Sequence, residues 1–253
     1  MEAKRLQVEQ VERPRPMAIE PEALEEEPTP SEREELRTQL VGETPGWYSP
    51  AGHLLGPSVF GLTVCVLAGF GLESVLWWEW FTIPAGWVFA NFVEWHAHRD
   101  LLHTRQWWMP VLYERHTPTH HRIFLAHDMA VRDRKEWRQV LMPAYAVALI
   151  VAALFPVTAA IWFAGLPNVA LFYLLTGTGY VLMYEWLHLS YHLAPETWVG
   201  RRRLIRYLRR HHAVHHTPRL MRRWNMNVTI PFWDRIRGTI VDEETAADVL
   251  RPR

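Results

Sequence analysis

The sequence predicts an all-α integral membrane protein, with four transmembrane helices in two hairpins and a cytosolic, histidine-rich helical cap. Three observations predict this fold. Two long stretches are almost free of charge, the basic residues all lie outside the turns of the expected hairpins, and histidines gather at the edges of the uncharged stretches. The length of 253 residues favours a single folded domain.

The longest uncharged stretch is residues 139–184, which contain no Asp, Glu, Lys or Arg. A single helix over this stretch would be roughly 69 Å long, more than twice a hydrocarbon core of about 30 Å. The stretch must therefore fold back, and the Gly-Leu-Pro-Asn sequence at 165–168 is its predicted turn. We expect transmembrane spans at 140–163 and 168–187.

A second stretch, residues 44–93, carries only Glu73 and Glu79 as charges. It predicts another hairpin, with spans at 54–72 and 78–97. The connecting turn is rich in tryptophan, a residue that favours the membrane–water interface. The tryptophans of this turn are Trp77, Trp78 and Trp80.

The basic residues predict the orientation of both hairpins. All 27 Lys and Arg lie in residues 1–45, 96–138 and 188–253, and the two predicted turns contain none. Under the positive-inside rule, both hairpins enter from the cytoplasm and return to it. The alternative is a soluble all-α protein, which would need partner surfaces for helices that are apolar all round. With 25 Arg and two Lys the composition favours a bacterial inner membrane, or the endoplasmic reticulum in a eukaryote.

Residues 1–45 differ in composition from the membrane-embedded domain expected over 46–253. They hold twelve Glu against six Lys and Arg, with few large apolar residues. Such a segment buries too little surface to offset its ordering entropy, so we expect a disordered acidic tail. A helix around Ser31–Leu40 is the alternative, with Ser31 and Glu34 as a capping box. We expect no signal peptide, and the single cysteine, Cys65, excludes an intrachain disulfide or a cysteine-based metal site.

Ten of the fourteen histidines form four clusters, and neutral imidazole is the commonest protein metal ligand. Residues four apart share a helix face. That spacing places His188 and His192 on one face, likewise His116 and His120, and likewise the histidines at 212, 215 and 216. His98 and His103 would instead be about 140° apart around an ideal helix, which predicts a helix end or bend between them. One such pair alone is usually a surface coincidence, but four clusters together predict enough ligands for two metal ions. The clusters are His98 and His103; His116, His120 and His121; His188 and His192; and His212, His215 and His216.

The histidines do not decide among iron, copper and zinc, although five nitrogens per ion would leave an octahedral position open. The other four histidines lie outside the clusters and we expect each to be structural; His127 and His211 are better candidates for contact with the site than His53 and His96. Nearby acids are candidates to orient the imidazoles through their second nitrogen, with an ion pair to arginine as the alternative. These candidates are Glu94, Asp100, Glu185 and Asp234.

The clusters and their neighbours resemble motifs of the fatty acid hydroxylase/sterol desaturase superfamily of membrane di-iron oxygenases. EWHAHRDLLH at 94–103 looks like the first histidine box, and HTPTHH at 116–121 matches the second. YEWLHLSYH at 184–192 and HHAVHH at 211–216 resemble the third and fourth boxes. NMNVTIPFWDRIRGT at 225–239 resembles the closing N-x-G…WD…GT signature, with Asn227 in place of the usual Gly and Arg237 where an aromatic is common.

The resemblance implies a four-helix membrane mushroom whose cytosolic cap holds two irons bound by the ten clustered histidines. It implies an oxygenase that uses O2 to hydroxylate a C–H bond of a lipid, such as a fatty acyl, sterol or carotenoid-like substrate. Zinc would be an expected purification artefact. Some members carry a fused cytochrome b5 domain, but residues 1–45 contain no histidine. We therefore expect a separate electron donor of ferredoxin, rubredoxin or cytochrome type, and no nucleic-acid partner. Glu185, Tyr184 and Asp234 are the candidates for a catalytic role.

Other functions remain open at this stage. A desaturase or an aldehyde-deformylating enzyme would use the same scaffold. A non-catalytic metal-binding membrane protein is a second alternative, although it would have no reason to keep every ligand. A metal transporter would place its polar ligands within the spans, and the predicted spans hold no clustered histidine.

Overall fold

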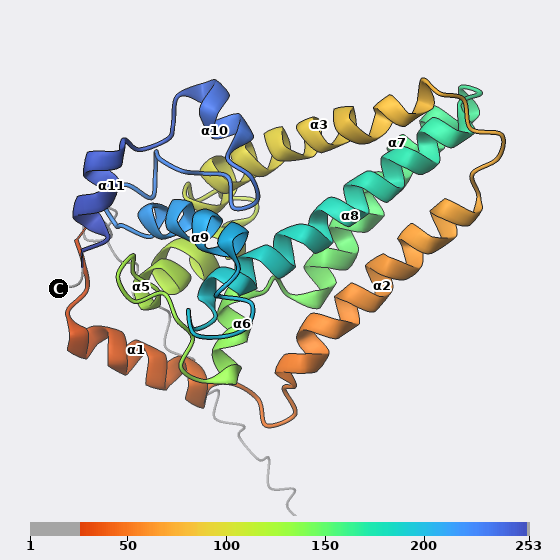
Figure 1. Cartoon of the computed structure of the whole chain (residues 1–253). Coiled ribbons are helices and arrows are strands. Elements are labelled where there is room, and N and C mark those ends of the chain that lie inside the picture. The colour runs from red at the N-terminus through yellow and green to blue at the C-terminus, as the bar shows by residue number, and fades with distance from the viewer. Residues whose placement is uncertain (1–25, 252–253) are drawn as a thin grey trace, which may run out of the picture.

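The structure is a computed structural model that describes residues 26–251. Over that range it is helical without any β-strand, and contains one isolated bridge between Leu125 and Asp128. Four of the described helices are long, with 16 to 26 residues. Figure 1 shows that they extend together on one side, with a rounded part built from shorter helices at one end of them. We call the rounded part the cap; it comprises residues 26–49, 98–143 and 193–251.

The first hairpin consists of α2 (Pro50–Phe70) and α3 (Thr82–Ala97), joined through the short helix η2 (Glu79–Phe81). Ser49 begins α2, because its hydroxyl accepts a hydrogen bond from the Gly52 amide at 3.1 Å. The connecting turn exposes aromatic side chains, with Trp77 77% exposed. Both helices lie close to the spans expected at 54–72 and 78–97.

The second hairpin consists of α7 (Ala144–Phe163) and α8 (Pro167–His192). Gly165 forms the turn with a φ of +84°, a left-handed conformation that glycine adopts without strain. At 26 residues α8 is about 39 Å long. It runs past the predicted end at residue 187 and carries His188 and His192 into the cap. Figure 1 shows this helix running from the far tip of the long helices into the cap.

The long helices pack around α8, which contacts α2, α3 and α7. Two glycines permit close approach to neighbouring leucines. A Cβ at Gly61 would lie 2.8 Å from a methyl carbon of Leu182, and one at Gly177 would lie 2.8 Å from Leu154. At the far tip, Asn168 joins the two turns: its amide donates to the Glu73 carbonyl at 2.8 Å and to the Glu79 carboxylate at 2.9 Å.

Two helical stretches in the described residues are long and apolar enough to cross a membrane, α2 and the stretch Arg134–Phe163 that includes α7. Only 28% and 17% of their most apolar windows are buried, whereas a core helix of a soluble protein would be mostly buried. The other two predicted spans do not meet the same criterion. α3 has only 16 residues, and α8 is an interior helix with buried polar residues such as Thr178 and Glu185.

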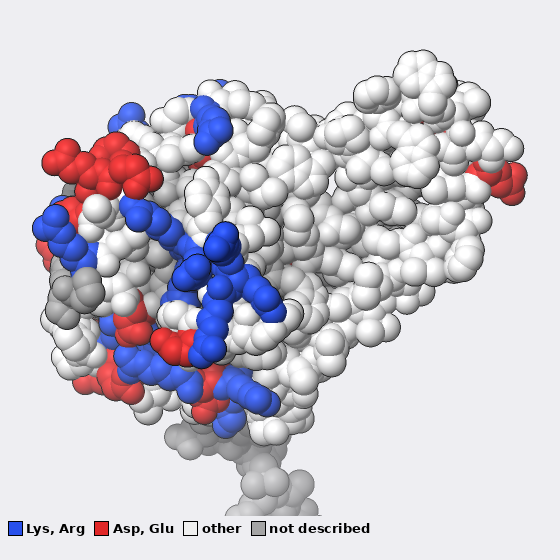
Figure 2. Space-filling model, viewed as in Figure 1, with Lys and Arg blue, Asp and Glu red and all other residues white. Residues whose placement is uncertain are grey.

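Charge is distributed unevenly over the surface. In Figure 2, basic and acidic side chains gather over the cap, whereas the visible surface of the long helices carries almost none apart from acidic atoms at the far tip. This uncharged surface consists of large apolar side chains, including Val59, Phe70, Leu149 and Phe163, each more than half exposed. A surface of this composition suits lipid better than water.

The cap consists of short helices connected by loops. It includes two π-helical turns, which have i→i+5 hydrogen bonds in place of the α-helical i→i+4 pattern. The π turns are η3 (His98–Leu102) and η4 (His116–His120). The remaining helices are α1 (Pro30–Gly42), α4 (Pro110–Arg115), α5 (His121–Ile123), η5 (Arg134–Glu136), α6 (Trp137–Val140), α9 (Arg203–His215), α10 (Phe232–Arg237) and α11 (Glu243–Val249).

Helix α1 corrects the expectation of a disordered tail through residue 45. Residues 26–45 are described, and Pro30–Gly42 among them form this helix, close to the alternative helix around Ser31–Leu40, while residues 1–25 lie outside the described range. The capping box is there, but it pairs Thr29 with Glu32 in place of Ser31 with Glu34. The segment is ordered by charge as well as by apolar burial, because Arg37 is 3% exposed and its guanidinium lies 2.7 Å from the Glu136 carboxylate. Loss of one partner of such a buried pair costs about 3–5 kcal/mol.

The close packing of α2 against α8 gives a prediction for Gly61→Ala. The new methyl group must displace Leu182, so we expect the free energy of unfolding to fall by about 1–3 kcal/mol. Gly69→Ala in the same helix is the matched control, because no atom lies within 4 Å of its new Cβ. Thermal unfolding in detergent should therefore show a lower midpoint for Gly61→Ala alone, and equal midpoints for the two variants would contradict this packing.

Candidate metal centre

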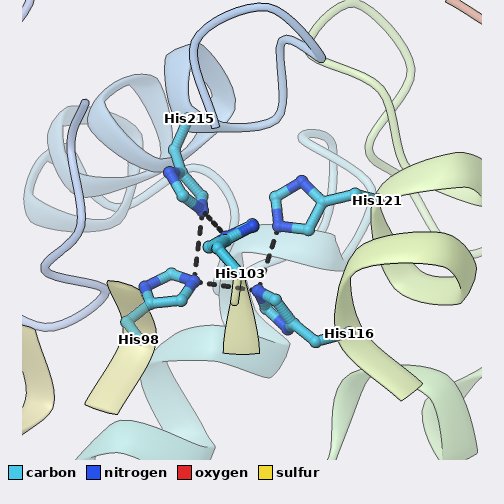
Figure 3. A group of neighbouring side chains, drawn as sticks. All are labelled: His98, His103, His116, His121 and His215. Atoms are coloured by element: carbon cyan, nitrogen blue, oxygen red, sulfur yellow. Dashed lines mark hydrogen bonds between the residues drawn. The ribbon is translucent and has the colours of Figure 1, made fainter. Parts of the chain in front are cut away.

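The ten clustered histidines come together in two groups of five: eight are in the cap, and His188 and His192 are at the end of α8. In each group, one nitrogen per imidazole lies within 4.8 Å of the corresponding atoms of the other four. Every one of the ten side chains is buried. The first histidine group is His98, His103, His116, His121 and His215, and the second is His120, His188, His192, His212 and His216. Figure 3 shows the first group, with its five rings pointing toward one centre.

The π turn η3 brings His98 and His103 into the same group. The His103 amide donates to the His98 carbonyl at 3.1 Å, an i→i+5 bond. This bond replaces the α-helical geometry that would separate the two side chains by about 140°. The sequence predicted a helix end or bend between these residues. In the structure this irregularity is a π turn.

The second π turn changes the expected pairing of His116. The i,i+4 spacing predicts that His116 shares a face with His120, but η4 again introduces an i→i+5 bond, here from the His121 amide to the His116 carbonyl. His116 therefore joins His121 in the first group. His120 points into the second group instead.

Helices α8 and α9 supply the remaining ligands. His188 and His192, four residues apart on α8, both belong to the second group, as their spacing predicts. On α9, His212 and His216 also belong to the second group, whereas His215 belongs to the first. The expected trio is thus divided between the groups, in the same way as the cluster at 116–121.

Backbone carbonyls hold the second ring nitrogen of half the histidines. In the first group, Nδ1 of His98 and Nδ1 of His215 donate to the carbonyls of Met226 and Trp224. In the second group, three Nδ1 atoms donate to carbonyls at 2.6–2.9 Å. These pairs are His120 with Gln139, His192 with Met129, and His216 with Phe124. A carbonyl can only accept, so Nδ1 carries the proton of each neutral ring and Nε2 keeps its lone pair.

A hydroxyl fixes His103 in the same way. The Thr117 hydroxyl donates to the Leu102 carbonyl at 2.7 Å, so its oxygen is free to accept from Nδ1 of His103 at 3.0 Å. Sequence reasoning did not identify Thr117 as a functional residue. Its position between two histidines of HTPTHH was the available signal, whereas the carbonyl acceptors carry no side-chain signal at all.

The decisive observation is that lone pairs face each other inside both groups. Nε2 of His98 and Nε2 of His215 are 3.1 Å apart, although each ring carries its proton on Nδ1. Nε2 of His120 and Nε2 of His216 are 3.3 Å apart under the same condition. Neither contact can be a hydrogen bond between neutral rings. A cation bound by the converging Nε2 atoms removes this repulsion, so the residues fit a metal ion in each group.

Burial keeps the imidazoles neutral and ready to bind a cation. Desolvation lowers the pKa of His98 to about 4 and that of His216 to about 3. The same effect lowers the pKa of the other eight rings well below the ordinary value. Mutual repulsion between neighbouring histidines adds to this lowering in most of them. Protons therefore compete weakly for these nitrogens near neutral pH.

Asp234 holds the loop that carries one of the carbonyl acceptors. Its carboxylate accepts from the Met226 amide at 2.9 Å and the Asn227 amide at 2.8 Å. Burial raises the pKa of Asp234, but the hydrogen bonds with His211, Thr239 and Asn227 together lower it overall. The unusual Asn227 contributes to the same loop, because its side chain accepts from the Asp234 amide at 3.0 Å. Asp234 thus acts on the Met226 loop and on His211, and not on a clustered histidine.

Glu94 anchors the next part of this loop. It accepts from the Thr229 amide at 3.0 Å, from the Thr229 hydroxyl at 2.6 Å, and also from the Val228 amide and the Tyr180 hydroxyl. Arg237, the other departure from the motif, lies with its guanidinium 5.2 Å from the Trp95 ring. The closing motif therefore fastens the 226–234 loop to α3.

The remaining acidic candidates, Asp100 and Glu185, have hydrogen-bond partners other than the clustered histidines. Asp100 bonds Arg99 and His96 near the surface, and Glu185 accepts from the Met142 amide at 3.2 Å. In the described residues, none of the four acids expected to orient imidazoles has a hydrogen bond to a clustered histidine, which corrects that expectation. Tyr184 lies closer to the site, with its ring centroid 5.6 Å from that of His188.

The four histidines outside the clusters have other partners. His211 bonds Asp234, the residue that holds the Met226 loop, at 3.1 Å. His127 lies 3.7 Å from Glu27 and belongs to neither group. His53 bonds Tyr48 and the Met142 carbonyl, and His96 bonds Asp100.

Comparison with protein families identifies the chain. A model of the fatty acid hydroxylase family matches residues 83–239, which include both histidine groups and the closing motif. The chain belongs to this family. The resemblance inferred from the histidine motifs is confirmed. A search of curated proteins and a search of solved structures found no match.

The division into two groups predicts the metal content of this family member. Replacing His188 by Ala should remove the ion of the second group alone, so that metal per folded chain falls from about two to about one. His96→Ala is the matched control, because His96 is a partly exposed neighbour of the first group that bonds Asp100. Elemental analysis of anaerobically purified protein measures both. A wild-type content of one ion or none would contradict the two-ion arrangement.

Proposed function

We propose that the protein is a di-iron, O2-dependent membrane oxygenase that hydroxylates a C–H bond of a lipid. One observation carries this proposal: two adjacent groups of five buried imidazoles whose converging nitrogens are free of protons. The ligand set contains no thiolate or carboxylate, and so differs from the usual structural zinc site. Family membership supports the same class of reaction.

The chain contributes ligand geometry and exclusion of water. When bound, two irons supply O2 activation and removal of hydrogen from an unactivated C–H bond. The carbonyls of Met226, Trp224 and Phe124 fix the rings so that Nε2 and not Nδ1 faces each centre. Complete burial of the rings keeps bulk water away from reactive species.

We further propose that all four long helices cross the membrane and that the cap lies on the cytoplasmic side. Two of them have the length and composition of spans. In this arrangement α3 and α8 complete the bundle with the less apolar residues turned inward. The two far turns carry no Lys or Arg, whereas all 27 of these residues lie in the segments 1–45, 96–138 and 188–253. A lipid substrate would reach the cap directly from the bilayer, and a separate ferredoxin, rubredoxin or cytochrome would deliver electrons from the cytosol.

A desaturase or aldehyde-deformylating enzyme is the alternative on the same scaffold, since it would need the same ligands. A non-catalytic metal-binding membrane protein is a weaker alternative. Nothing about such a role explains why ten imidazoles are buried with their tautomers fixed, at the cost of removing so many polar rings from water.

The reaction is tested with purified protein, a chemical or protein reductant, and lipid extracts under labelled dioxygen. We expect a lipid product with a single labelled oxygen atom. Zinc-loaded protein is the control and should produce nothing, since zinc has no redox chemistry. Label from water would contradict oxygenation, and a product two hydrogens lighter without label would favour the desaturase.

The topology predicts which side of the membrane each exposed turn reaches. Cysteine at Ala164, in the exposed α7–α8 turn, should react with an impermeant thiol reagent added to intact cells. Cysteine at Lys135, an exposed position in the cap, should react only after the membrane is opened. A Cys65→Ala background removes the native thiol. The reverse labelling pattern would refute a cytoplasmic cap.

A further inference from the structure

The carbonyls that hold the second histidine group come from a single segment of the chain. Phe124, Met129 and Gln139 provide acceptors for His216, His192 and His120. His188 hydrogen-bonds the backbone of Val140 in the same segment. The orientation of four of the five rings in this group therefore depends on the position of residues 124–140. The first group depends instead on Thr117 and on the 224–226 backbone.

Helix α1 is attached to this segment by hydrogen bonds from one buried guanidinium. Arg37 donates to both oxygens of Glu136, at 2.7 and 2.9 Å, and to the Ile123 carbonyl at 2.9 Å. Ile123 immediately precedes Phe124, the residue whose carbonyl holds His216. The guanidinium also lies 5.2 Å from the centre of the Phe124 ring. One side chain thus fixes residue 123 and residue 136, near the two ends of the segment.

Two further contacts strengthen this attachment. Arg33, one turn before Arg37, donates to the Asp128 carboxylate at 2.6 Å, close to the Met129 acceptor. Glu136 in turn accepts from the Arg132 amide at 2.8 Å, which holds its carboxylate against the backbone of the same segment. Leu36 and Leu40 pack against a core that includes Phe124 and Val140.

We infer that Arg37 is a positioning residue for the second metal site: through Glu136 and Ile123 it holds the carbonyls that orient the second histidine group. This inference rests on the proposed metal-binding function. Helix α1 lies before residue 83, where the family match begins, so this support comes from outside the matched region. Retention of the second ion is thereby coupled to the docking of α1, whereas the first ion is independent of it.

The test measures bound Zn²⁺ per folded chain after loading in detergent. Arg37→Met should lower the content from two ions to about one, because only one group loses its supports. In a His98→Ala background, where the first group is disabled, Arg37→Met should leave no bound ion. In a His188→Ala background, where the second group is disabled, Arg37→Met should leave the remaining ion in place.

Two variants of the same helix serve as controls. Gln39→Ala removes an exposed side chain whose hydrogen bond is to Glu43 within α1, and it should bind zinc like the wild type. Arg37→Lys keeps the charge but not the fork that reaches Glu136 and Ile123 together, so it should retain more zinc than Arg37→Met and less than the wild type. Full zinc content in Arg37→Met, or equal loss from both groups, would overturn the inference.

Backbone amide exchange of the metal-free protein separates this inference from the proposed function. Arg37→Met should exchange faster than the wild type over residues 123–140 and unchanged over 224–234. Unchanged exchange over 123–140, or faster exchange over both segments alike, would overturn the role of Arg37. A wild-type protein that binds no zinc would contradict the proposed metal function, and the exchange result would still decide whether Arg37 supports the segment.

Discussion

The constraint on which the rest of the cap depends is the burial of ten uncharged imidazoles in one place. Each neutral ring has one donor and one acceptor nitrogen, and a buried polar atom without a partner is costly. The chain meets this constraint by giving Nδ1 a fixed acceptor in most rings, which leaves Nε2 for a cation. Nδ1 of His121 and of His212 are the buried exceptions without a partner. The short π turns, the closing loop and the 124–140 segment all take their positions from this requirement.

The sequence predicted the long helices well because they follow from simple physical rules. An uncharged stretch that is too long for one span must turn, and Gly165 lies at the turn as expected. The ten histidines were also found from spacing alone, but their division into groups was not. His116 and His120 are four residues apart, but a π turn places them in different groups. A π turn cannot be recognised from side-chain periodicity, so the sequence did not predict this division. The orienting groups were missed for a related reason: carboxylates such as Glu185 carry a visible signal, whereas the carbonyl of Phe124 carries none.

Composition misled the prediction at α1 for a different reason. Many glutamates and few large apolar residues indicate disorder when each charge is considered alone. Here Arg37 forms a buried ion pair with Glu136, which lies almost one hundred residues later in the chain. A long-range pair of this kind cannot be inferred from a local window. The same applies to Asp234 and Glu94, which the sequence indicated as candidates to orient imidazoles and which hold the backbone of the closing loop.

The interleaving of the two histidine groups has a consequence for how such a chain can change during evolution. His120 and His121 are neighbours that face different groups, and so are His215 and His216. Insertion or deletion of one residue within either segment would exchange the centres that these rings face, and no adjustment of side-chain rotamers would restore them. These segments can therefore vary by replacement of the intervening residues but not in length.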